Sequence, residues 1–154
     1  RMRQLDHTGI YLVIAGSFTA IAGLTLQGSA RIGLLIAVWV IAGAGIAYRW
    51  LPIVPPFGLT TALYVLLTAL FVPFISDLSA ALGAGGVAVL VVSCVIYFFG
   101  ALALGARVPD RFPRTFGYHE VWHVVVVVCS GLQYFVVVAY AIPAAREMAE
   151  NVAI

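Results

Sequence analysis

Long apolar runs separated by short polar breaks make up most of the chain. A helix needs about 20 apolar residues to cross the hydrocarbon core of a bilayer. Five runs approach that length, at residues 8–26, 31–48, 57–75, 82–105 and 116–142. Because a backbone in hydrocarbon must satisfy its own hydrogen bonds, each run is predicted to be a membrane-spanning helix.

The breaks between the runs contain residues typical of turns: "QGSA", "RWLPIVPP", "SDLSA" and "RVPDRFPR". Short breaks between closely spaced spans indicate antiparallel neighbours in one bundle. Pro73 is predicted to kink or end the third span, and Pro143 the fifth, because proline lacks a backbone N–H. The predicted fold class is all-α: an integral membrane bundle of five transmembrane helices, forming a single domain over residues 1–154.

Composition excludes a soluble domain. The chain is 64% hydrophobic and 9% charged, whereas soluble domains carry about 25% charged residues. Its net charge of +2 gives no support for a nucleic-acid partner, so membrane lipids are the expected partners. Cys94 and Cys129 both fall in apolar runs and are predicted to be buried small side chains rather than a disulfide.

The arginines predict how the bundle is oriented. With five spans, the N-terminus shares one side of the membrane with the second and fourth breaks. That side holds six arginines: Arg1, Arg3, Arg49, Arg107, Arg111 and Arg114. The other side holds Arg31 and Arg146. The positive-inside rule therefore predicts a cytoplasmic N-terminus and an outer C-terminus. Arginine as the sole basic residue type, in a chain rich in Ala, Gly and Val, favours a bacterial inner membrane.

The start of the fifth span carries the clearest chemistry. His119, Glu120 and His123 form an H-E-x-x-H motif. The two histidines are four residues apart and share a helix face, so both imidazoles could coordinate one metal ion. Ser130 and Tyr134 fall within about 20° of His123 on the helical wheel, which predicts a polar stripe facing the protein interior. Alternatively, both histidines are neutral interfacial residues with hydrogen bonds to tyrosine or backbone.

Asp6 and His7 begin the first span, at the same predicted membrane level as the histidine pair. A metal near a helix N-terminus needs an anion nearby, and Asp6 could ligate it or hold a metal-bound water. Asp6 could instead cap the first helix. His7 is equally well explained as a site residue or an interfacial residue. A catalytic zinc typically has three protein ligands and a water, so either Asp6 and His7 complete the set or one ligand is missing.

Two blocks resemble the hemolysin III family, which belongs with the progestin and adipoQ receptors. They are "RQLDHTGIYLVIAGS" at residues 3–17 and "FGYHEVWHV" at residues 116–124. The resemblance implies seven spans, of which this chain corresponds to spans three to seven. The two preceding spans are therefore expected upstream of Arg1. The chain departs from the family pattern at two positions: Ala20 replaces a proline, and Gln133 stands where members often carry a further histidine.

The resemblance further implies a Zn²⁺ site near the cytoplasmic face. Its metal ligands would be His119, His123 and a third histidine upstream of Arg1, with Asp6 holding or activating the zinc-bound water. His7, Ser130 and Tyr134 are candidates for the shell around the ligands. One implied function is a ceramidase-like, zinc-dependent hydrolase of lipid amides or esters. The alternative is a non-enzymatic receptor or membrane-homeostasis protein with structural zinc.

An intramembrane H-E-x-x-H protease, with Glu120 as general base, is less favoured. It needs a third metal ligand, and the acids downstream are Glu147 and Glu150. These lie beyond Pro143 at the opposite membrane face, about 40 Å along the helix. They cannot reach the histidine pair.

Overall fold

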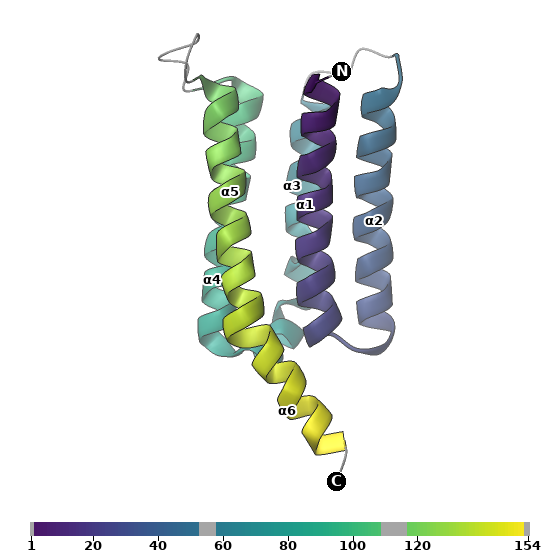
Figure 1. Ribbon diagram of the computed structural model, residues 1–154, viewed down its shortest axis with the longest axis vertical. Helices are drawn as coiled ribbons and strands as arrows, with labels where there is room; N and C mark the ends of the chain where they lie inside the picture. Colours follow the sequence, from purple (N-terminus) through teal and green to yellow (C-terminus); the bar gives the residue numbers. More distant parts are fainter. Residues whose placement is uncertain (1, 53–57, 109–116, 153–154) are drawn as a thin grey trace.

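The computed structural model describes residues 2–52, 58–108 and 117–152, and every regular element in these ranges is helical. The elements are α1 (Met2–Thr25), α2 (Gly28–Trp50), α3 (Leu59–Ala69), the 3₁₀-helix η1 (Val72–Phe74), α4 (Ile75–Ala106), α5 (Tyr118–Val136), the π-helix η2 (Val137–Ala141) and α6 (Ile142–Val152). Figure 1 shows α1 to α5 side by side along one axis, with α6 leaving the bundle at an angle. The predicted all-α membrane bundle is confirmed.

Four continuous helical segments are long and apolar enough to cross a membrane: Gln4–Thr25, Gly28–Trp50, Leu59–Ala106 and Tyr118–Asn151. The third of these has 48 residues and includes both α3 and α4. The chain folds back at the end of the bundle opposite the N-terminus (Figure 1), and within α4 the helical backbone is interrupted at Gly83. The five predicted spans therefore correspond to the five helices α1 to α5.

The α-helix of the third span is interrupted near the end of its apolar run. Helix α3 ends at Ala69, and Pro73 lies in the 3₁₀-helix η1 that follows. A proline cannot donate the hydrogen bond that would continue an α-helix. The prediction that Pro73 kinks or ends this span is confirmed.

The break predicted at "SDLSA" is wrong, because these residues are helical and α4 already begins at Ile75. Asp77 lies in the first turn of α4, where a negative charge favours helix formation. The interruption falls later, at Gly83, whose φ of 66° and ψ of 176° are not helical. A glycine adopts this backbone conformation readily because it has no Cβ.

The fifth span bends where Pro143 was predicted to kink or end it. Helix α5 passes into the π-turn of η2, and α6 then continues to Val152 in a new direction (Figure 1). Glu147 and Glu150 lie on α6, near the C-terminus and far from the start of α5. The predicted separation between these acids and the histidine pair is therefore confirmed.

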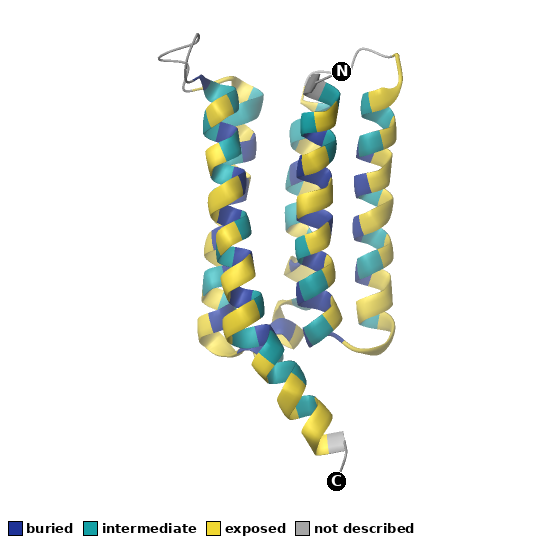
Figure 2. Cartoon of the chain, in the orientation of Figure 1, coloured by how far each residue is buried: buried dark blue, intermediate teal, exposed yellow. Residues whose placement is uncertain are grey.

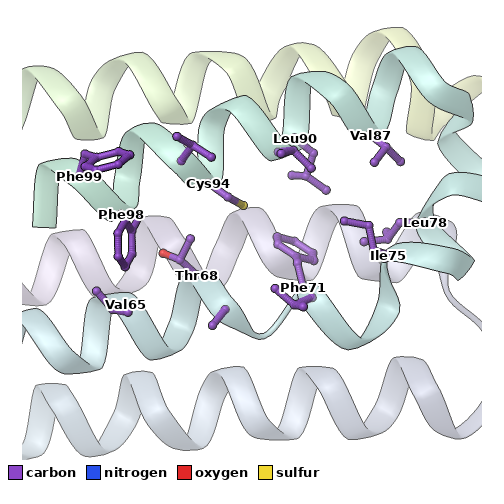
Figure 3. A pocket seen from close by; sticks show the side chains of 14 residues that line it. Val65, Thr68, Phe71, Ile75, Leu78, Val87, Leu90, Cys94, Phe98 and Phe99 are labelled. Atoms are coloured by element: carbon purple, nitrogen blue, oxygen red, sulfur yellow. The ribbon is translucent and has the colours of Figure 1, made fainter.

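Helix α1 lies at the centre of the bundle. Of its membrane-spanning window 44% is buried, against 22–28% for the other three segments. Figure 2 shows exposed residues along the outer faces of the helices, where apolar side chains such as Val40 and Val127 would meet lipid. Between α3 and α4 lies an apolar cavity of about 470 Å³ (Figure 3). Its one hydroxyl, on Thr68, donates a hydrogen bond to the Tyr64 carbonyl.

A glycine on α2 allows α1 to approach closely. A Cβ on Gly45 would lie 2.5 Å from Cζ of Tyr11, a fully buried ring on α1. Gly43, one half-turn away on the same helix, is exposed and has open space around it. The two glycines therefore differ in packing while sharing a helical backbone.

We expect Gly45→Ala to destabilise the bundle by about 1–3 kcal/mol, because the new methyl group would displace Tyr11. The matched control Gly43→Ala should be neutral or stabilising, since alanine is the better helix former. Thermal unfolding in detergent, followed by circular dichroism, measures both. Equal effects of the two substitutions would contradict the close packing of Tyr11 on Gly45.

Candidate metal site

Asp6, His119 and His123 converge at the end of the bundle that holds the N-terminus. Asp6 comes from the first turns of α1, and both histidines come from the first two turns of α5. Oδ2 of Asp6 lies 3.1 Å from Nε2 of His119, and its Oδ1 lies 3.2 Å from Nε2 of His123. The two Nε2 atoms are 3.2 Å apart. Two segments near opposite ends of the chain thus bring three metal-binding groups to one point.

The geometry of these three residues fits a metal ion. Their ligand atoms all lie within 4.8 Å of one another. Two ligands of a tetrahedral zinc, each at about 2.0–2.1 Å, are about 3.3 Å apart, close to the separations measured here. Oδ2 of Asp6 is buried yet has no hydrogen-bond partner of suitable geometry. A buried carboxylate oxygen normally accepts a hydrogen bond, so one without a hydrogen-bond donor fits a role next to a cation or a water bound to it.

The role of Glu120 in this structure differs from that of the general base in an H-E-x-x-H protease. Its Oε2 accepts a hydrogen bond of 2.9 Å from the backbone N–H of Gly117, the residue that caps α5. The Glu120 side chain is exposed, and it does not belong to the group that could hold a metal. Glu120 therefore stabilises the start of α5, which sets where His119 and His123 lie along the bundle.

His7 lies beside the three ligands rather than among them. It is 6% exposed, and its ring is 6.2 Å from the ring of His119 in an edge-to-face arrangement. Its Nδ1 lies 3.3 Å from the hydroxyl of Tyr64, and the imidazole tautomer decides which group donates. The Tyr64 ring in turn stacks on Trp122 of α5 at 5.3 Å. Of the two interpretations left open for His7, the structure favours a buried residue next to the site.

Sequence reasoning missed Tyr64 and Trp122, which border this site. Trp122 lies inside the H-E-x-x-H motif, so its proximity to both histidines could have been noticed. Tyr64 has no motif around it. Its only sequence signal is a lone tyrosine in the apolar third run.

The predicted polar stripe along α5 is wrong at Tyr134, whereas Ser130 is half-buried and faces Tyr97 of α4. Tyr134 is 71% exposed, and the Ser130 hydroxyl bonds the Val126 carbonyl of its own helix at 2.7 Å. The buried face of α5 instead repeats at intervals of four and three residues, with Trp122, Val126, Cys129, Gln133 and Val136. This spacing is typical of helices packed side by side. The face lies about 100° from His123, so Tyr134 points away from the core.

The fold and the site define a multi-pass membrane protein of the all-α class with an Asp–His–His group at one end. The chain belongs to the haemolysin-III related family, whose model matches residues 1–134.

Two relatives are similar over almost the whole chain. Hemolysin-3 of Bacillus cereus is 30% identical over 142 residues, which cover 92% of this chain and 62% of the relative. The Hemolysin-3 homolog of Bacillus subtilis (strain 168) is 27% identical over 139 residues, covering 90% of this chain and 62% of the relative. The chain thus spans less than two thirds of the length of either relative. No solved structure matches it.

The convergence of Asp6, His119 and His123 predicts how metal binding responds to substitution. We expect His119→Ala and His123→Ala each to weaken Co²⁺ binding by about 100-fold or more, because each removes a direct ligand. Glu120→Gln should leave the affinity unchanged, because the glutamine oxygen can still accept the hydrogen bond from the Gly117 N–H. Titration of the purified protein with Co²⁺, followed by visible absorption, measures all three. Loss of binding in Glu120→Gln would contradict the site described here.

Proposed function

We propose that Asp6, His119 and His123 belong to a zinc site that hydrolyses an amide or ester bond of a membrane lipid. The observation that carries this proposal is the convergence of one carboxylate and two imidazoles at one end of a membrane bundle. Nitrogen and oxygen ligands of this kind suit zinc. Membership in the haemolysin-III related family agrees with the proposal.

His119 and His123 would hold the zinc ion, and Asp6 would accept a proton from a zinc-bound water. Zinc at such a site lowers the pKa of a water molecule to about 7, which supplies a nucleophile near neutral pH. Each oxygen of Asp6 lies within about 3.2 Å of one imidazole, so the carboxylate lies where it can accept a proton from that water. It can then deliver the proton to the leaving amine or alcohol.

The depth of the site favours a lipid as substrate. All three residues lie in the first turns of membrane-spanning segments, at one end of the bundle. This depth corresponds to the boundary between headgroups and acyl chains. The amide or ester bonds of membrane lipids lie at that boundary. We infer from the arginine distribution that this end faces the cytoplasm.

A structural zinc is the alternative to a catalytic one. A structural zinc is closed by four protein ligands, whereas a catalytic zinc keeps an open position. A receptor or membrane-homeostasis protein with structural zinc is the alternative that the following experiment separates.

We expect Asp6→Asn in the full-length protein to lower lipid turnover by about 100-fold or more, because asparagine cannot accept the proton. Zinc content should be retained. Asp77→Asn is the matched control, since Asp77 is an exposed carboxylate at the first turn of α4. The assay is hydrolysis of ceramide-like and ester lipids in vesicles, with metal analysis of each variant. Bound zinc without turnover in the unsubstituted protein would decide for structural zinc.

A further inference from the structure

Tyr64 of α3 lies between the two helices that supply the proposed ligands. It is 1% exposed. Its ring packs on Tyr11 of α1 at 4.9 Å between centroids and stacks on Trp122 of α5 at 5.3 Å. Its hydroxyl pairs with Nδ1 of His7, which also belongs to α1. A single side chain of α3 thus contacts both α1 and α5.

These contacts fall on the immediate neighbours of the ligands. His7 follows Asp6 directly on α1, and Trp122 precedes His123 directly on α5. A rotation of α1 by about 25° would move its Cα atoms by about 1 Å, and the tip of a side chain by more. Asp6 lies within 3.2 Å of both imidazoles in the present arrangement of α1 and α5, and a rotation of this size would change both distances. Whatever fixes His7 and Trp122 therefore also fixes the distances between the ligands.

We propose that Tyr64 is a positioning residue for the Asp6, His119 and His123 site. Its hydroxyl holds α1 through His7, while its ring holds α5 through Trp122. The metal-binding part of this inference rests on the proposed function. The part that concerns the placement of α1 against α5 does not.

The Tyr64 hydroxyl has a directional role that a simple core residue lacks. A tyrosine hydroxyl in an apolar bundle must find a hydrogen-bond partner, or burial costs free energy. The recorded partner of Tyr64 is an imidazole on another helix. Because a hydrogen bond is directional, it restricts the rotation of α1 more tightly than apolar packing does.

Tyr97 of α4 provides a matched control. It is 3% exposed, and its ring lies 6.2 Å from that of Trp122. Its hydroxyl lies 3.5 Å from both the Val126 carbonyl and the Ser130 hydroxyl, and both of these groups belong to α5. Tyr97→Phe therefore removes an equally buried hydroxyl next to the same tryptophan, without touching His7.

The first experiment compares Co²⁺ binding by Tyr64→Phe and Tyr97→Phe. We expect Tyr64→Phe to weaken binding about tenfold and to change the visible absorption of the Co²⁺ form, because outer residues that orient ligands have effects of this size. Tyr97→Phe should retain the affinity and the spectrum. Thermal unfolding should shift by a similar amount in both variants, so that lost stability alone does not explain a difference in binding.

The second experiment needs no metal. Spin labels at Leu5→Cys on α1 and Val124→Cys on α5 report the spacing of the two helices, since both positions are exposed. The native Cys94 and Cys129 are replaced by alanine in this background. We expect the distance distribution from pulsed electron paramagnetic resonance to broaden in Tyr64→Phe and to stay unchanged in Tyr97→Phe.

The two experiments separate the inference from the proposed function. Absence of Co²⁺ binding in the unsubstituted protein would reject the metal site, and the distance measurement would still decide the role of Tyr64. The inference stands if the distances broaden in Tyr64→Phe alone, with weaker Co²⁺ binding wherever the unsubstituted protein binds it. Any other result overturns it.

Discussion

The contact of one carboxylate with two imidazoles constrains the whole site end of the bundle. A charged side chain on a membrane-spanning helix is more stable when it has a partner inside the protein. Asp6 is on a span that is otherwise almost free of charge, and it meets His119 and His123 from the far end of the chain. The start of α5 must therefore lie beside the start of α1. The central position of α1 in the bundle follows from the same requirement, because α1 has to face α5 as well as α2 and α3.

The H-E-x-x-H motif has a different structural role here from its role in a soluble protease. In this chain the motif lies in the first turns of α5. A glutamate in a first turn can accept a hydrogen bond from the backbone N–H of the residue that caps the helix. Glu120 does this with Gly117. The glutamate thus fixes the beginning of α5, while the histidines on either side of it point to Asp6. The position of the motif at the start of its helix therefore determines the role of its glutamate.

The number of helices in the bundle could be predicted from the sequence, because it depends on counting apolar runs. The same counting placed Asp6 and the histidine pair at one end of the bundle. The face of α5 that is buried could not be predicted, since Gln133 is buried and Tyr134 exposed although both are polar. That choice depends on which neighbours α5 packs against. Tyr64 was missed for the same reason: its importance arises from three contacts on two other helices, and nothing in its local sequence records them.

Two interruptions of the helices lie at the end of the bundle opposite the site. Gly83 breaks the helical backbone of α4, and η2 inserts a π-turn before Pro143. The two irregularities meet, because a Cβ on Gly86 would lie only 3.0 Å from Cγ of Tyr140 in the π-turn. At the site end, by contrast, α5 is regular from Tyr118 through both histidines and rests on a layer of aromatic rings. A bend placed near the C-terminal end of α5 lets the chain leave the bundle without rotating the turns that carry His119 and His123. The regular first turns of α5 can therefore keep their angle to α1, which is the condition that the three-residue site imposes.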